Sequence, residues 1–404
     1  MPANVLDDIN PKEIGRRLRE ARERQRLTQA EAANIIDTSR TTMVAIEKGK
    51  RQVRPGELIS LARAYGRPVS DFVRSRPSVR SFQVQFRAAR VRSAQENEEI
   101  EPVIEAWQGL CESYLELEEA LNAPLPRAYP PEHEISWFPT EVMAESIAAS
   151  ERNRLGLGDG PVGRLRDVLE QEVGLRVFYL PMPPKFSEIY AYDDRLGGCL
   201  AINAHHPVER QRWSLSHGYL HFLAHRRNPV FHYEGQYDRW PESERLADAF
   251  AMHFLLPTSS VSRHFAAFKR DGKFTPADLL TLADYYGVGV ETLVRRMEGL
   301  KLLPTGTWES LKSRGFKVRE AQTQFSIEAR ERERVDKYPV YYKHLAIEAL
   351  DDGSITEGRF AELLGVDRVA ARQIAAVLRQ RSSGIEDGST EIDLSLREAS
   401  VGEV

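Results

Sequence analysis

Two histidines in an apolar segment constrain this chain more than any other feature. His217 and His221 stand four residues apart within the run 212–225, whose apolar residues favour a buried helix. On a helix, residues i and i+4 lie one above the other, with Cβ atoms about 5–6 Å apart, so both imidazoles can reach one metal ion. In the zinc-binding pattern H-E-x-x-H the second position is a glutamate that acts as general base. Here that position is Gly218, so the sequence predicts a zinc-binding frame that lacks the residue for hydrolysis.

Length and composition set the broad class. A chain of 404 residues is too long for one ordinary core and indicates two or three domains. With 41% hydrophobic and 29% charged residues, and no apolar run of about 18 residues, we expect a soluble globular protein without a membrane span. The start of the chain lacks the pattern of a signal peptide, and Cys111 and Cys199 are too few and too far apart for a disulfide framework or a cysteine zinc site. These features predict a cytoplasmic location.

The charge is unevenly spread. Residues 12–76 contain 16 Lys/Arg and 8 Asp/Glu, a balance of +8, whereas the whole chain carries −4. The remainder therefore carries −12. A basic module on an acidic body is typical of a nucleic-acid binder.

A helical motif accompanies this basic module. Thr28 followed by Glu31 forms a capping box that predicts a helix start, and Asp37 occupies the left-handed turn position before a next helix over 40–47. Further apolar spacing predicts helices before and after this pair. The run T-Q-A-E-A-A…T-S-R-T-T-M…I-E-K-G-K-R-Q resembles the XRE/Cro-type helix-turn-helix family across residues 10–76.

That resemblance implies contacts with double-stranded operator DNA. Arg40 is the first candidate for direct readout, because a guanidinium pairs bidentately with guanine. For Ser39 and Thr42 the alternative is a role only in starting the helix. A dimer reading two half-sites is expected, because one module makes few contacts. The predicted DNA-binding residues are Gln29, Ser39, Arg40, Thr41, Thr42, Ala45, Lys48, Lys50 and Arg51.

Residues 77–135 are predicted to connect the domains. The alternation of Phe82, Val84 and Phe86 with polar residues predicts a short extended stretch. Apolar residues from Ile100 to Leu121 then recur at helical spacing. This stripe is either a dimer seam or a surface that packs on the following domain.

The next domain contains most of the histidines. Strands are predicted over 174–180 and 198–203, and eight of the ten histidines lie between His205 and His264. A third metal ligand is expected from the alanine-rich helix over 242–257. The candidates on that helix are Glu244, Asp248 and His253, and weaker candidates elsewhere are His205, His206, His232 and His264.

The two segments R-Q-R-W-S-L-S-H-x-x-x-H-F-L and E-x-x-A-x-x-F-A-x-x-x-L-L-P together resemble the ImmA/IrrE family of metallopeptidases, across about residues 140–305. The resemblance implies that His217, His221 and Glu244 are zinc ligands and that the catalytic glutamate falls on Gly218. Glu242 or His225 could replace the base only if the fold brings it within hydrogen-bond reach. The alternatives are a structural zinc, slow residual hydrolysis, or a hydrogen-bonded histidine pair without metal.

The C-terminal region repeats a helix-turn-helix spacing between Lys337 and Leu378, which we interpret as a dimer or capping element rather than a second DNA reader. Residues 382–404 are predicted to be a flexible acidic tail. The overall prediction is a mainly α, multidomain protein with an all-α N-terminal domain, a central α+β zincin-like domain and a helical C-terminal region. The predicted boundaries are 10–76, 77–135, 136–305, 306–381 and 382–404.

These patterns predict a dimeric DNA-binding transcription regulator, of repressor or antitoxin type, with a zinc-peptidase-like sensor domain that is catalytically impaired. The partners expected are operator DNA, a second copy and a toxin or repressor protein, with no membrane. The alternative is a site-specific zinc metallopeptidase that cleaves a repressor or itself.

Overall fold

The computed structural model describes residues 10–25, 27–67, 69–73, 81–82, 85–86, 94–133, 139–233, 241–269, 273–325 and 336–382. The chain divides into two compact units, 1–77 and 78–404, and each is described by itself. It is mainly helical, with one small sheet in the second unit, which confirms the predicted fold class. No helix among the described residues is both long and apolar enough to span a membrane.

In the described residues of the first unit, all of the regular secondary structure is helical. Its helices are α1 (Pro11–Arg24), α2 (Gln29–Ile35), α3 (Arg40–Glu47), α4 (Pro55–Ala64) and α5 (Ser70–Val73). The predicted capping box of Thr28 and Glu31 starts α2, and Asp37 takes the left-handed conformation with φ 48°. Gly15 lies so close to α3 that an added Cβ would be 2.3 Å from the carbonyl oxygen of Ile46. A glycine is therefore needed where α1 crosses α3.

A buried polar network ties the first three helices together. The guanidinium of Arg22 donates to the carboxylate of Glu47, with Nε 2.6 Å from Oε1, and both side chains are buried. Gln29 Nε2 donates to the other carboxylate oxygen at 2.8 Å. The free-energy cost of burying the Glu47 carboxylate is offset because both of its oxygens accept hydrogen bonds.

A four-stranded mixed sheet forms the centre of the second unit. Its strands are β1 (Arg176–Leu180), β2 (Phe186–Asp193), β3 (Gly197–Asn203) and β4 (Val230–Tyr233), in the order β1-β3-β2-β4. β1 runs parallel to β3, and β2 is antiparallel to both β3 and β4. Consecutive residues along β1 and β3 are buried, so helices must cover both faces of the sheet.

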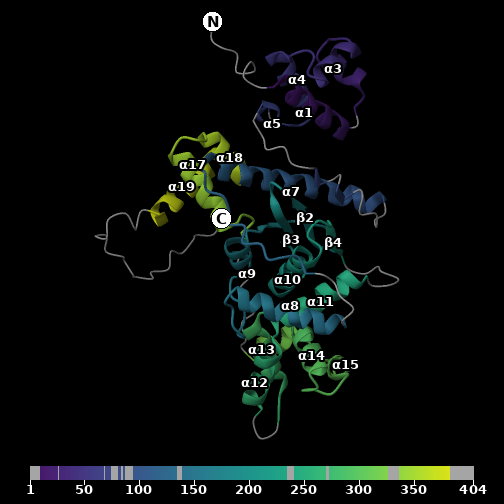
Figure 1. Cartoon of the computed structure of the whole chain (residues 1–404), viewed down its shortest axis with the longest axis vertical. Coiled ribbons are helices and arrows are strands. Elements are labelled where there is room, and N and C mark those ends of the chain that lie inside the picture. Colours follow the sequence, from purple (N-terminus) through teal and green to yellow (C-terminus); the bar gives the residue numbers. More distant parts are fainter. Residues whose placement is uncertain are drawn as a thin grey trace, which may run out of the picture. The chain divides into compact units, whose positions relative to one another are not determined.

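Figure 1 shows helices on both sides of the sheet. On one side α10 (Val208–Ala224) lies next to the strands, α8 (Thr140–Arg154) and α11 (Glu242–Leu255) lie beyond it, and α13 (Pro276–Tyr286) and α14 (Val290–Gly299) lie farther from the sheet. The layer on the other side contains α7 (Ala94–Ala120), α17 (Val340–Asp351), α18 (Glu357–Leu364) and α19 (Arg368–Ser382). The other helices in the described part of the unit are α9 (Leu165–Val168), the π-helix η1 (Leu169–Val173), α12 (Thr258–Phe268), α15 (Thr307–Ser313) and α16 (Val318–Gln324).

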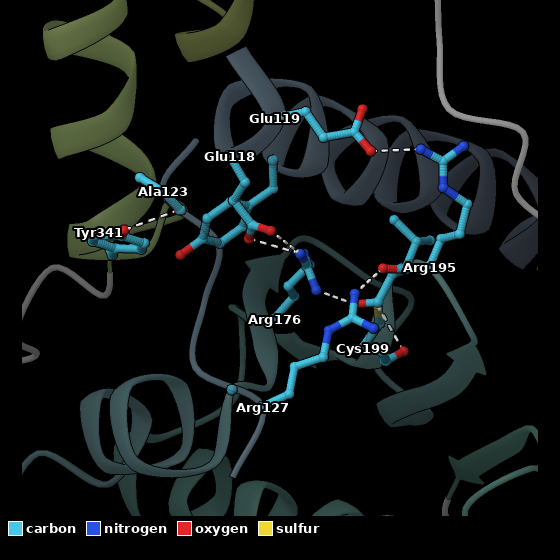
Figure 2. Close-up of polar contacts among 12 residues, drawn as sticks. Glu118, Glu119, Ala123, Arg127, Arg176, Arg195, Cys199 and Tyr341 are labelled. Carbon is cyan, nitrogen blue, oxygen red and sulfur yellow. Dashed lines mark hydrogen bonds and ion pairs between the residues drawn. The ribbon is translucent and has the colours of Figure 1, made fainter. Parts of the chain in front are cut away.

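The segment predicted as a connector is part of this core. Ile104, Trp107 and Tyr114 of α7 are buried with side chains of the sheet and of α17, so the apolar stripe packs within its own chain. At the end of α7, Arg176 of β1 forms a buried ion pair with Glu118 and donates to the carbonyl of Leu196 (Figure 2). The C-terminal helices and the long α7 thus form one layer.

One local prediction was wrong. Within the stretch expected to be extended, residues 77–92, the described residues Phe82, Gln85 and Phe86 are helical. The rings of Phe82 and Phe86 lie 4.6 and 6.4 Å from that of Trp107. Phe82 and Phe86 are four residues apart, a spacing that places two side chains on one face of a strand and also on one face of a helix. Their packing on Trp107 favours the helix. The predicted tail 382–404 lies outside the described residues except for Ser382.

Candidate metal centre

The helix that carries the histidine pair is anchored directly to the end of a strand. α10 follows β3 after a short turn, and Gln211 in its first turns is buried. Gln211 Nε2 donates to the carbonyl oxygens of Asn203, Ala204 and His206 at 3.3, 3.2 and 2.9 Å. These hydrogen bonds satisfy the carbonyl groups at the end of β3 and in the turn after it, and they fix the start of α10 against the sheet.

The three residues predicted as zinc ligands lie together. His217 and His221 are fully buried on α10, with ring centroids 4.9 Å apart. Glu244, near the start of α11, is 4% exposed, and its carboxylate oxygens lie 3.5 Å from His217 Nε2 and 3.4 Å from His221 Nε2. Ala247 and Ala251 of α11 are fully buried, and their small side chains let α11 pack closely.

The buried nitrogens in this cluster fit a metal ion. Within the described part of the chain, Nε2 of His217 and Nε2 of His221 have no hydrogen-bond partner. A buried polar atom without a partner costs about 1–3 kcal/mol. Two imidazoles and a carboxylate are a donor set typical of zinc. The residues therefore fit zinc.

Glu188 of β2 holds the first histidine in place. Its Oε1 accepts a hydrogen bond from His217 Nδ1 at 2.8 Å, and neither side chain is exposed. With Nδ1 protonated, the Nε2 lone pair of His217 faces Glu244, as a metal ligand requires. Burial, with the nearby His232, lowers the pKa of His217 to about 3, so the imidazole is neutral. Sequence reasoning missed Glu188, although an acid inside the apolar run of β2 is the kind of signal that could have found it.

Gly218 is packed against the sheet. A Cβ at this position would lie 2.4 Å from Leu200 Cδ2 and 3.0 Å from Glu188 Oε1. The side chains of β2 and β3 therefore fill the space next to Gly218. A side chain at position 218 would therefore require Leu200 or Glu188 to move.

Two further side chains with metal-binding donor atoms lie beside His217, His221 and Glu244. His232 of β4 has Nδ1 3.2 Å from Glu244 Oε2, and its ring lies 4.1 Å from that of His217. Asp248 Oδ1 is 3.7 Å from His217 Nε2. Single donor atoms of His217, His232 and Asp248 all lie within 4.8 Å of one another, as do those of His217, His221 and Glu244.

Burial and charge oppose each other in this cluster. Burial alone would raise the pKa of Glu244, but the hydrogen bond from His232 and the nearby His221 and His217 lower it to about 2. Burial alone would lower the pKa of His232, but the hydrogen bond to Glu244 and the charge of Glu188 raise it overall. The interaction between the two residues thus lowers the pKa of the Glu244 carboxyl group and raises the pKa of the His232 imidazole.

Other predicted candidates lie elsewhere. Within the described residues, no donor atom of His205, His206, His253 or His264 belongs to either cluster. His253 interacts instead with Glu141 and Arg296 at 3.1 and 3.0 Å. His225 has its ring 5.6 Å from that of His221 but contributes to neither cluster, and the same holds for Glu242.

The predicted DNA-binding residues divide into two groups in the first unit. Arg40, Thr41, Lys48 and Lys50 are exposed, whereas Thr42 and Ala45 are half-buried. Ser39 is also exposed and caps α3, its Oγ accepting from the backbone N–H of Thr42 at 3.2 Å.

The second group already has partners within the domain. Gln29 donates to Glu47, and Arg51 forms a bidentate pair with Glu57 at 2.9 and 2.7 Å. Of the basic residues predicted to contact DNA, Arg40, Lys48 and Lys50 are thus the exposed ones.

Comparison with known proteins assigns both regions. A family model described as a helix-turn-helix domain matches residues 13–72, and one described as an IrrE N-terminal-like domain matches residues 170–298. No curated protein matches. Similar solved structures include the apo form of the competence regulator ComR from Streptococcus vestibularis, which is 11% identical. That match covers 92% of this chain and 98% of that chain with a TM-score of 0.15, too low to support an argument about the fold.

Proposed function

We propose that this chain, which joins a helix-turn-helix domain to an IrrE N-terminal-like domain, is a cytoplasmic transcription regulator of repressor or antitoxin type. In this proposal the first unit binds operator DNA as a homodimer. The second unit binds zinc and acts as a sensor or recruits a partner, and its peptidase chemistry is impaired.

The observation that carries this proposal is the packing around Gly218. Bound zinc lowers the pKa of a coordinated water to about 7 and polarises a carbonyl. Hydrolysis of a peptide also needs a group that takes the water proton and returns it to the leaving amine, a contribution of about 10²–10⁴ in rate. Leu200 and Glu188 occupy the space next to Gly218. In this proposal the chain holds zinc through His217, His221 and Glu244 and has no base at position 218.

The DNA role rests on the basic balance of residues 12–76 and on the exposed side chains of α3. Arg40 lies at the first position of this helix, where a recognition helix meets base edges, and Lys48 and Lys50 follow its end. Lysines close to the DNA backbone contribute sequence-independent affinity. A toxin or a second repressor is the partner class proposed, with autoregulation of the operator.

The second candidate function is a site-specific zinc metallopeptidase that cleaves a repressor or itself. One observation favours it. A carboxylate oxygen of Glu188 lies 3.0 Å from where the Cβ of residue 218 would be, so the site does contain an acid near the missing one. In the structure this acid is engaged with His217, which favours a positioning role.

The DNA arm of the test uses sites selected from random duplexes by the purified full chain. Arg40→Ala should relax the choice among selected sites, and Lys50→Ala should weaken binding to all sequences and reduce its salt dependence. Equal effects of the two substitutions on all sequences would contradict the assignment.

The enzyme arm incubates the zinc-loaded chain alone and with a peptide library. We expect no cleavage above that of the His217→Ala, His221→Ala double variant. Cleavage by the native chain that is lost in Glu188→Gln would overturn the proposal and establish the peptidase.

A further inference from the structure

The metal centre contains more donors than an open zinc site uses. Catalytic zinc has three protein ligands and one position for water, whereas structural zinc has four protein ligands. Building on the zinc site of the proposed function, we propose that His232 is the fourth protein ligand. The site is then closed, and zinc joins the edge strand β4 to α10 and α11.

The spacing of the donor atoms supports a single shared ion. Ligands about 2.0–2.1 Å from a tetrahedral zinc lie about 3.3–3.4 Å from one another. The distances from Glu244 oxygens to His232 Nδ1, His221 Nε2 and His217 Nε2 are 3.2, 3.4 and 3.5 Å. The contacts of His232 and His217 are with the same oxygen, Oε2, and that of His221 is with Oε1. Each contact is close in length to an edge of such a tetrahedron.

Burial distinguishes His232 from Asp248, the other added donor. The side chain of His232 is 13% exposed and that of Asp248 is 37% exposed. Asp248 Oδ1 also lies 3.7 Å from its neighbouring donor, His217 Nε2, whereas His232 Nδ1 lies 3.2 Å from Glu244 Oε2. A fourth ligand inside a water-excluded site is therefore better supplied by His232, with Asp248 at the rim.

Because His232 lies on the edge strand β4, a closed site would affect how firmly this strand is held. β4 pairs only with β2 in the sheet as described, and its register with β2 is shifted between Phe186 and Glu188. Zinc held by His232 would fix this short edge strand to two helices. Loading and loss of the metal would then change how firmly β4 is held, which is a property suited to a sensor and not to a peptidase.

Cobalt replaces zinc as a spectroscopic probe in the full-length protein. The wild-type chain with Co²⁺ should show the intense visible absorption of a tetrahedral site, and added azide should leave that spectrum unchanged. His232→Ala should bind Co²⁺ more than about 100-fold more weakly, beyond the range of about 10–100-fold for outer-shell partners. Its residual spectrum should respond to azide because one position has become open.

A second variant separates a ligand from a hydrogen-bond donor. His232→Gln retains an N–H that can donate to Glu244 but removes the imidazole nitrogen. It should therefore behave like His232→Ala if His232 is a ligand, and like wild type if His232 only orients Glu244. His225→Ala, which removes a neighbouring histidine outside both donor clusters, should retain wild-type affinity and spectrum.

Three outcomes would overturn the proposal: a wild-type spectrum that azide shifts, a His232→Gln variant with wild-type affinity, or a loss that appears in Asp248→Asn but not in His232→Ala. Circular dichroism of the metal-free variants verifies that each is folded. If the wild-type chain binds no Co²⁺ or Zn²⁺, the closed site and the zinc role both fail. Operator binding, measured on the same preparation, shows separately whether the regulator function stands.

Discussion

Glu188 Oε1 accepts a hydrogen bond of 2.8 Å from His217 Nδ1, between a strand and a helix whose side chains are both fully buried there. The strand thereby sets the ring orientation and the tautomer of a histidine on α10. Because the same carboxylate lies 3.0 Å from where a side chain at Gly218 would begin, it also restricts what can follow the histidine. The orientation of His217 and the limited space at Gly218 thus both depend on Glu188.

The first prediction concerns this carboxylate. Glu188→Ala should weaken zinc binding by about 10–100-fold, because removal of an outer-shell partner leaves the ligand ring free to turn. Glu188→Gln should lose less, since its amide oxygen can still accept from Nδ1. Chelator competition measures both affinities.

Glu170→Gln is the matched control, because Glu170 is a buried acid that interacts with Tyr114 of α7 and belongs to neither donor cluster. It should bind zinc as tightly as wild type. An unchanged affinity in Glu188→Ala would contradict the positioning role.

The second prediction concerns Gly218. Gly218→Ala places a methyl group 2.4 Å from Leu200 Cδ2, and overpacking of this kind costs about 1–3 kcal/mol. The higher helix propensity of alanine returns up to about 1 kcal/mol. Urea denaturation without metal should therefore show a net loss of up to about 2 kcal/mol.

Leu200→Ala provides the test of that cause. Alone it should cost about 2–5 kcal/mol, because it removes a fully buried side chain. Combined with Gly218→Ala, the loss should be about 1 kcal/mol smaller than the sum of the single losses. Strict additivity would show that Leu200 does not set the limit at position 218. A variant that introduces a glutamate at position 218 should accordingly include Leu200→Ala.

The sequence predicted those parts of the molecule whose signals are local. The capping box at Thr28 and Glu31 and the left-handed Asp37 lie within a few residues of the turn that they specify, and both are confirmed. The i, i+4 spacing of His217 and His221 likewise encodes their proximity on one helix face.

Non-local contacts account for what sequence reasoning missed. Glu188 lies 29 residues before His217, and only the pairing of β2 with β3 brings it beneath α10. The sequence did not distinguish His232 from the other candidate histidines, because its position beside the cluster depends on the pairing of β4 with β2. Strand neighbours depend on the topology of the whole unit, which no single window of sequence contains. For the same reason the apolar stripe of α7 did not show whether this helix forms a dimer seam or packs within its own chain.

The third prediction concerns the buried pair of Arg176 and Glu118 (Figure 2). Their side chains are 0% and 3% exposed, and Arg176 Nη2 lies 2.5 Å from a Glu118 oxygen. Arg176→Met leaves the carboxylate buried without its cation and should cost about 3–5 kcal/mol. The double variant Arg176→Met, Glu118→Leu should be less destabilised than Arg176→Met alone, because no isolated charge remains.

Urea denaturation of the second unit measures these changes. The exposed pair of Arg379 and Asp351 is the matched control, since it joins two helices of the same layer but lies in solvent. Arg379→Met should change stability by less than about 1 kcal/mol. A loss in Arg176→Met no larger than that control would contradict a structural role for the buried pair.

The last prediction concerns the pH dependence set by Glu170. Burial raises the pKa of this carboxyl group from 4.5 to about 7, against the opposing effects of Arg166 and of the hydrogen bond from Tyr114. The folded state therefore binds a proton that the unfolded state releases between these values. The stabilising contribution is fully present below about pH 4.5 and is lost as the pH rises through about 7. A shift of this size corresponds to about 3 kcal/mol.

Glu170→Gln keeps the shape of the protonated acid and removes its titration. The variant should resemble wild type in stability near pH 5 and exceed it by about 3 kcal/mol near pH 8, as measured by urea denaturation of the second unit at each pH. Glu172→Gln, a substitution of an exposed acid two residues away, should leave the pH profile of wild type unchanged. If Glu170→Gln instead follows the wild-type profile at both pH values, the carboxyl group is not protonated in the folded chain, and the buried contact with Tyr114 holds a charge.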